Sequence, residues 1–207
     1  MNNTTASTKL EITGIWVATG SANQHIIERN FIHSFSYANT TNTAAVFTGI
    51  DCGGGTSTFR NNMIRLGIDE NGNSVVNGLL FRGMTKGVAT NNNFYHNSVY
   101  IGGTGVNSSA VNSIAFARGT TGTDEIINNI FVNNRSNATT GGGHYAIRLN
   151  SGTGTLTLNN NVYQHNGTGG VFGFNGTVDV PTWTSGWAGG DRSEEHTSEL
   201  QSPCNVV

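Results

Sequence analysis

One short phrase recurs five times along the chain and divides it into segments of nearly constant length. In each copy, polar residues rich in asparagine stand directly before a pair of apolar or aromatic residues. Aligned on the last asparagine before that pair, the copies lie 32, 31, 36 and 32 residues apart, at Asn30, Asn62, Asn93, Asn129 and Asn161. A period of this length is typical of a repeat architecture, in which every segment folds into the same unit.

Each segment carries further short apolar runs between the asparagine phrases. One set of runs lies at 14–17, 45–48, 79–82, 114–117, 145–148 and 170–173, and another set directly precedes each phrase. Runs of this length bounded by Asn and Gly are typical of strands and turns, and no stretch has a helical period. One repeat is therefore strand, asparagine corner, strand, loop, strand.

Three short strands per repeat fit one coil of a parallel β-helix, in which coils stack at about 4.8 Å. A tight corner requires left-handed backbone, which Asn tolerates better than other residues with a side chain. Amides stacked at the same corner can also hydrogen-bond from coil to coil. The sequence thus predicts an all-β solenoid of five to six coils. Its asparagine ladder would consist of Asn30, Asn62, Asn93, Asn129 and Asn161.

The pattern apolar-x-Asn-Asn-x-apolar resembles that of right-handed parallel β-helix repeat proteins of the pectate-lyase-like superfold, over about residues 10–180. The resemblance implies a right-handed solenoid from a bacterial secreted or cell-surface protein. Residues 1–9 would then be an incomplete or disordered N-terminal edge. Residues 181–191, with Trp183 and Trp187, would form a partial cap or the start of a following segment.

The last residues differ in composition from the repeats. Residues 192–202 resemble the translation of a common sequencing-library adapter, so we expect 192–207 to be an artefactual, disordered tail and the natural chain to be longer. Removing this tail takes away one of ten basic and three of twelve acidic residues, which leaves nine of each. A neutral body lacks the basic surface that nucleic-acid binding requires.

The sequence also disfavours a membrane-spanning protein and a disulfide-rich protein. No apolar run approaches the roughly 18 residues of a membrane span, and the first residues lack the pattern of a signal peptide. Cys52 and Cys204 do not make a disulfide framework.

The resemblance raises the question of catalysis, because parallel β-helices commonly host polysaccharide lyases and glycosidases. Hydrolysis of a glycoside requires two carboxylates facing one another across the substrate, and a calcium-assisted lyase requires stacked Asp ligands. No two repeats place carboxylates at the same position. Asp69–Asn73 is typical of an Asn-Gly turn, and His33, His96 and His165 lie on alternate coils, too far apart to share a metal. We predict no catalytic residue, metal or cofactor.

Three arginines follow the same apolar run in successive repeats: Arg82, Arg118 and Arg148. If they point outward, they form a basic stripe suited to the carboxylates of an acidic glycan.

A second outward row is also predicted. Strand alternation places Ile32, Tyr95, Phe131 and Tyr163 inside. The row expected outside, and expected to be partly buried at the corner, is Phe31, Met63, Phe94, Ile130 and Val162.

We therefore predict a non-catalytic fragment of an extracellular or cell-surface β-helix protein, acting as an adhesin, a spacer or a polysaccharide-contacting scaffold. The alternative is part of a polysaccharide lyase or glycoside hydrolase whose catalytic residues lie on missing coils, and a trimeric phage-type fibre is a third possibility. A cut solenoid also exposes strand edges, so we expect residues 1–191 to self-associate.

Overall fold

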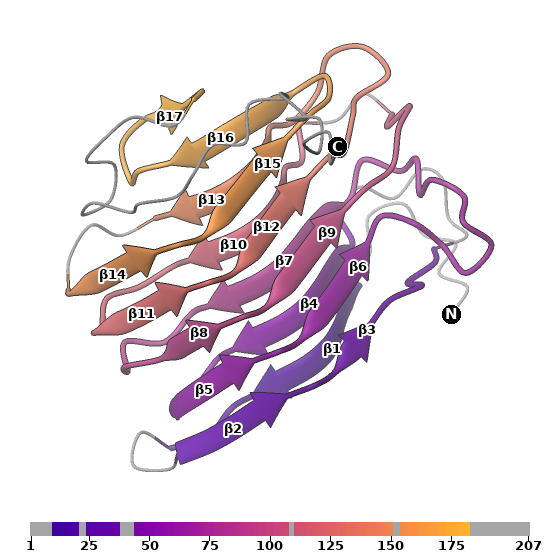
Figure 1. Cartoon of the computed structure of the whole chain (residues 1–207). Helices are drawn as coiled ribbons and strands as arrows, with labels where there is room; N and C mark the ends of the chain where they lie inside the picture. The colour runs from indigo at the N-terminus through magenta and orange to yellow at the C-terminus, as the bar shows by residue number, and fades with distance from the viewer. Residues whose placement is uncertain (1–9, 21–23, 38–43, 108–109, 151–153, 183–207) are drawn as a thin grey trace, which may run out of the picture.

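The computed structural model describes residues 10–20, 24–37, 44–107, 110–150 and 154–182, and these residues form 17 strands (Figure 1). None of the described residues lies in a helix, so this part of the chain contains no helix that could cross a membrane. The predicted tail and most of the predicted cap fall in 183–207, outside the described residues.

The strands fall into three sheets, named A, B and C here. Sheet A contains β1 (Glu11–Val17), β4 (Val46–Cys52), β7 (Leu80–Lys86), β10 (Ser113–Arg118), β13 (His144–Leu149), β16 (Gly170–Phe174) and β17 (Asp179–Val180). Sheet B contains β2 (Gln24–Glu28), β5 (Thr56–Arg60), β8 (Asn93–Tyr95), β11 (Asp124–Ile127) and β14 (Leu156–Asn159). Sheet C contains β3 (Phe31–Ile32), β6 (Met63–Leu66), β9 (Ser98–Ile101), β12 (Ile130–Asn133) and β15 (Val162–His165).

The chain visits the three sheets in a fixed order. It runs through A, B and C five times and then returns to sheet A with β16, so that five coils are stacked through four coil-to-coil steps. Every strand pair is parallel except β16 with β17, which is antiparallel. The predicted all-β parallel solenoid is confirmed.

The corner between sheets B and C has the same backbone in all five coils. One residue there has a positive φ of 53–59°, and it is Arg29, Asn61, His96, Asn128 or Asn160. The following residue is the ladder asparagine. Its side-chain amide nitrogen donates to Oδ1 of its counterpart in the next coil, at 2.9 Å from Asn30 to Asn62, 2.9 Å from Asn62 to Asn97, 3.0 Å from Asn97 to Asn129 and 3.0 Å from Asn129 to Asn161.

The sequence prediction was wrong about the third member of this ladder. Asn97 occupies the corner, whereas Asn93 begins β8 and pairs with Thr58 and Glu125 within sheet B. The error arose because Asn93-Phe94 has the same asparagine-then-apolar pattern as the corners of the other coils, but it lies within β8, before the corner. The true spacings are 32, 35, 32 and 32 residues, so the third coil is longer by three residues without a break in the ladder.

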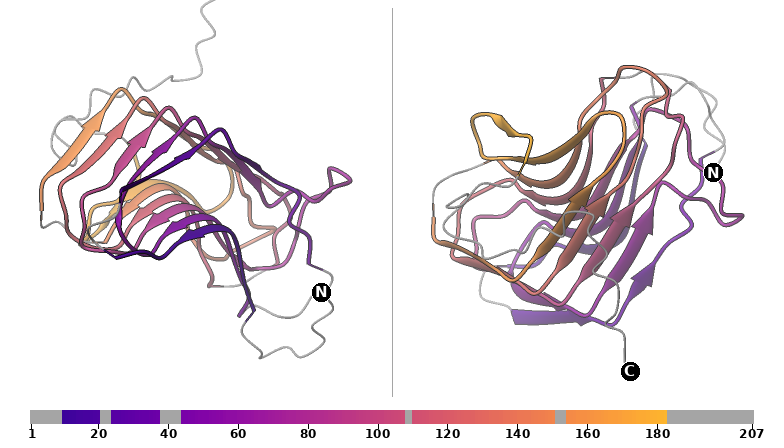
Figure 2. Two further views of the ribbon diagram at one scale, coloured as in Figure 1. Left: turned by 90° about the horizontal axis from the view of Figure 1, so that it is seen from below. Right: turned by 45° about the horizontal axis from the view of Figure 1, so that its top comes forward.

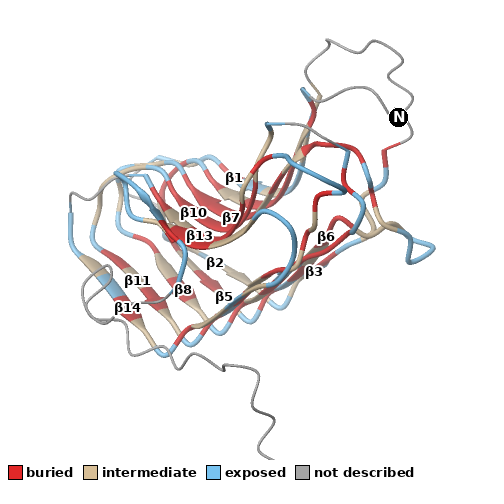
Figure 3. Cartoon of the chain, turned by 90° about the horizontal axis from the view of Figure 1, so that it is seen from above, coloured by how far each residue is buried: buried red, intermediate tan, exposed pale blue. Residues whose placement is uncertain are grey.

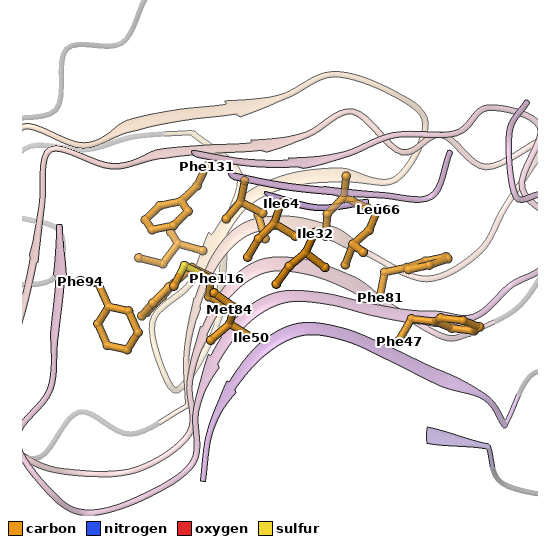
Figure 4. Close-up of a cluster of buried hydrophobic side chains, with 14 of the residues drawn as sticks. Ile32, Phe47, Ile50, Ile64, Leu66, Phe81, Met84, Phe94, Phe116 and Phe131 are labelled. Carbon is orange, nitrogen blue, oxygen red and sulfur yellow. The ribbon is translucent and has the colours of Figure 1, made fainter. Parts of the chain in front are cut away.

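Large apolar side chains from all three sheets fill the interior (Figure 4). Phe94 on sheet B has its ring centroid 5.0 Å from that of Phe116 on sheet A, which in turn lies 5.1 Å from that of Phe131 on sheet C. All three rings are fully buried. The predicted outward position of Phe94 was therefore wrong, and Val99 rather than Tyr95 takes the inward position in the third coil of sheet C.

Sheet C carries an exposed apolar row on its outer face. Phe31, Met63 and Ile130 are 57%, 56% and 44% exposed, and Ser98 takes the equivalent place in the third coil. We expected this row to be partly buried at the corner. It is instead open at Phe31, Met63 and Ile130, because the outward positions of a flat strand point directly away from the core. Val162 in the last coil is half-buried, as expected.

The strands of sheet A bend midway along their length (Figures 2 and 3). In β4 the consecutive residues Gly49 and Ile50 are both buried, which breaks the strict alternation of the strand. A Cβ on Gly49 would lie 2.6 Å from the Ile64 side chain and 2.6 Å from the carbonyl oxygen of Gly83. Gly or Ala also occupies this place in β1, β7, β10 and β13, so the bend recurs and the outer face of sheet A becomes concave.

Candidate functional site

The concave outer face of sheet A holds a groove of about 640 Å³ that crosses β4, β7, β10 and β13. Its floor is apolar, since Ile114 and Ala117 lie within it. Asn112 and Asn150 contribute amide groups to the lining. The bend in the strands positions these side chains, because it brings the outward residues before and after it to face the same space.

Two arginines line the groove. Arg82 is an outward residue of β7, and Arg148 is an outward residue of β13, two strands further along the sheet. Strand spacing therefore separates them by about 10 Å along the solenoid axis. The guanidinium carbon of Arg148 lies 4.7 Å from the ring centroid of Phe174, and its Nε donates to Oδ1 of Asn150 at 2.9 Å. These contacts orient Arg148 within the groove.

Arg118 does not join them, and the predicted stripe of three arginines was wrong. Arg118 is 1% exposed and pairs with Lys86 and Leu149 at an inward position of sheet A. Its place in the sequence differs by one residue from that of Arg148, and a shift of one residue in a strand moves the side chain to the opposite face. Arg82 is also out of register with Arg148, since Arg82 is level with Tyr145 and Arg148 is level with Thr85.

Carboxylates are few around the groove. Among the described residues that line it, Asp51 is the single acid, and it accepts a hydrogen bond from the Thr85 hydroxyl. Just beyond the lining, the Tyr145 hydroxyl donates to Asp179 Oδ2 at 3.3 Å. Burial and this contact raise the pKa of Tyr145, so its hydroxyl stays protonated at neutral pH. The groove thus offers guanidinium and amide donors over an apolar floor, groups that suit hydroxyl and carboxylate oxygens.

A first buried polar cluster lies inside the corner between sheets A and B. Nζ of Lys86 is 2.9 Å from Oδ2 of Asp124, and Nε of Arg118 is 2.8 Å from the same oxygen. All three side chains are at most 1% exposed. Burial lowers the pKa of Lys86. Sequence reasoning missed this cluster, because its members are spread over two coils and only the register shows that they meet.

Cys52 lies beside Lys86 in the neighbouring strand of sheet A. This thiol is at the buried end of β4. Burial raises the pKa of this thiol to about 12, which keeps it protonated and unreactive at neutral pH.

A second buried cluster combines a hydroxyl, an imidazole and an amide. Ser113 Oγ lies 2.8 Å from His144 Nδ1, and His144 Nε2 lies 3.0 Å from Asn137 Oδ1. The order of groups is that of a nucleophile with its base, but Ser113 and His144 are 0% and 1% exposed, so a substrate cannot reach them. Burial, and then the charge of Arg135, lower the pKa of His144 to about 4. These residues therefore hold the interior together as neutral groups.

The described residues contain no group of three or more His, Cys, Asp or Glu side chains that could hold a metal ion. Asp69 Oδ1 accepts the backbone N–H groups of Asn71 and Asn73, and Gly72 has a φ of 82°. This geometry is that of the Asn-Gly turn predicted for the segment.

Comparison with protein-family models, with curated proteins and with solved structures gave no match. The strand pairing shows a parallel β-solenoid, while the pectate-lyase-like resemblance stays a prediction from the sequence.

Proposed function

We propose that this chain is a polysaccharide-contacting part of a secreted or cell-surface β-solenoid protein, and that it does not itself catalyse a reaction. The groove on sheet A is the contact surface. The observation that carries the proposal is the pair of partly exposed arginines on its walls, Arg82 and Arg148. Among the described residues that line the groove, the single acid is Asp51, on β4 and outside the strands between the two arginines. Such a surface attracts anionic groups and offers a bidentate donor to each.

The chemistry of the lining also favours a carbohydrate over other anions. The amides of Asn112 and Asn150 match sugar hydroxyls, and the floor of Ile114 and Ala117 matches the apolar face of a sugar ring. A chain-like ligand can follow the groove across several coils, since β4, β7, β10 and β13 all contribute to it. An acidic polysaccharide satisfies the cationic, polar and apolar parts together.

The test is retention of the protein on immobilised uronate-rich polysaccharide at low ionic strength. We expect the double variant Arg82→Gln/Arg148→Gln to lose roughly 100-fold or more in affinity, because each charge-assisted contact is worth about 1.5–3 kcal/mol. The control is Arg65→Gln, which removes one such charge from the outer face of sheet C and should bind like the wild type, whereas each single variant in the groove should bind more weakly.

Unchanged retention of the double variant, or equal loss in the Arg65 control, would refute the groove as the contact surface. Release of shortened or unsaturated sugar products by the wild-type protein would instead support the alternative of a polysaccharide-degrading enzyme. Among the described residues that line the groove, Asp51 stands alone as an acid, which favours binding without cleavage.

A further inference from the structure

The buried cluster of Lys86, Asp124 and Arg118 has a composition that ion pairing alone explains poorly. Two cationic side chains share one carboxylate oxygen in a place that water does not reach. Moving an ion from water into such a site costs several kcal/mol, and the attraction of one carboxylate offsets this only in part. The burial that lowers the pKa of Lys86 acts in the same direction, toward an uncharged amine.

The geometry points to a covalent bond between these side chains: we propose that Lys86 and Asp124 condense to an isopeptide. The amine nitrogen already lies 2.9 Å from Asp124 Oδ2, within reach of the carboxyl carbon. Groups held together in this way react with effective molarities of about 10⁵ M or more. Lys86 is among the residues that line the groove, but its side chain is 0% exposed, so the inference does not depend on the proposed function.

The reaction needs no reagent from outside the protein. Nζ of Lys86 attacks Cγ of Asp124, and the bond from Cγ to one carboxyl oxygen breaks. Of the three hydrogens on the ammonium group, one remains on the amide nitrogen. The other two leave with the carboxyl oxygen as one molecule of water. No atom is oxidised or reduced.

Neighbouring groups are placed to assist each part of this step. Nε of Arg118 donates to Oδ2 at 2.8 Å, where it stabilises the negative charge that develops on that oxygen during the attack. The backbone N–H of Asn92 donates to Oδ1 at 3.0 Å and fixes the plane of the carboxyl group. Lys86 Nζ also donates to the Thr121 carbonyl, which holds the amine beside its target.

The product leaves fewer ions buried. Condensation lowers the number of buried charges in the cluster from three to one, that of Arg118, while the net charge stays at one positive. The new amide oxygen remains an acceptor for Arg118. Arg118 keeps its hydrogen bond to the Gly122 carbonyl at 3.0 Å. The bond would also tie β7 of the third coil to β11 of the fourth, a covalent link across 38 residues of chain.

Mass spectrometry of the denatured full chain tests the proposal directly. We expect an intact mass lower than the sequence mass by one water. We also expect a tryptic peptide in which 83–118 is joined to 119–135, because trypsin does not cleave after an acylated lysine. Lys86→Arg keeps a buried cation but has no primary amine, so this variant should show the full sequence mass and unlinked peptides.

The wild-type protein alone decides the question, whether or not the variant folds. An intact mass equal to the sequence mass, with ordinary cleavage after Lys86, would refute the bond and leave a buried ion pair. A mass loss with unlinked 83–86 and 119–135 peptides would refute it equally, since the water would then have come from another place.

Discussion

Each interior ladder asparagine stabilises the fold through hydrogen bonds to two neighbouring coils. The Asn97 amide donates to Asn129 and to the Phe59 carbonyl, and its Oδ1 accepts both the backbone N–H and the side-chain amide of Asn62. Removal of this side chain leaves buried donors and acceptors in two coils without their partners. Asn93, by contrast, is a partly exposed residue of sheet B.

We therefore expect Asn97→Ala to lower the free energy of unfolding by about 3 kcal/mol, because each buried polar group left unsatisfied costs about 1–3 kcal/mol. Asn93→Ala, one strand away, should change it by less than about 0.5 kcal/mol. Urea unfolding followed by circular dichroism measures both. Similar losses in the two variants would contradict the assignment of the ladder.

His144 predicts a pH dependence of stability. Its pKa is about 4 in the folded protein and about 6.5 in an unfolded chain, so the unfolded state takes up a proton that the folded state excludes. The full stability is present above pH 6.5, and it is lost progressively as the pH falls from about 6.5 to about 4. This residue alone should remove about 2 kcal/mol between pH 7 and pH 5.

The test compares urea unfolding at the two pH values in the wild type, in His144→Gln and in the control His33→Gln, whose side chain is exposed. His144→Gln should lose about 2 kcal/mol less than the wild type over this range, whereas His33→Gln should follow the wild type. Parallel pH profiles in all three proteins would show that His144 titrates normally.

At the scale of elements, the bend in sheet A decides the shape of the groove. It coincides with a small residue, Gly or Ala, where two strands and sheet C approach one another. At Gly49 an added Cβ would meet a backbone oxygen and Ile64, neither of which can move away without shifting a strand.

Gly49→Ala should therefore destabilise the protein by about 1–3 kcal/mol through overpacking. The matched control is Gly87→Ala just after β7, where the nearest atom to an added Cβ lies 3.9 Å away, and its effect should be within about 0.5 kcal/mol. Thermal unfolding compares the two. Equal melting temperatures would mean that the strands bend for another reason.

Elements also show why sequence reasoning succeeded in part. The period of the asparagine phrase and the short apolar runs predicted the three strands of each coil and their parallel stacking. The alignment of the repeats then failed in two places. Asn93-Phe94 copied the corner pattern within a strand, and Arg118 lies one residue later in its strand than Arg148, which places its side chain on the opposite face.

For the whole molecule, the fold was accessible from the sequence and the candidate site was accessible only in part. The aligned repeats named Arg82 and Arg148 in advance as outward groups, although the strand register places them three residues apart rather than at equivalent positions. The groove between them could not be named in advance, because it depends on the curvature of a sheet, and curvature follows from contacts between coils. The cluster of Lys86, Arg118 and Asp124 has no repeat of its own, and only the register brings it together.

The hydrogen bonds of the asparagine ladder all run in one direction, which gives the solenoid a dipole along its axis. Asn30, Asn62, Asn97 and Asn129 each donate to the following coil, and each accepting oxygen faces the preceding coil. The dipoles of these four hydrogen bonds therefore add along the axis and polarise one another. Their negative end faces the first coil, the reverse of an α-helix, whose N-terminal end is positive. The two ends of this stack are thus electrically distinct.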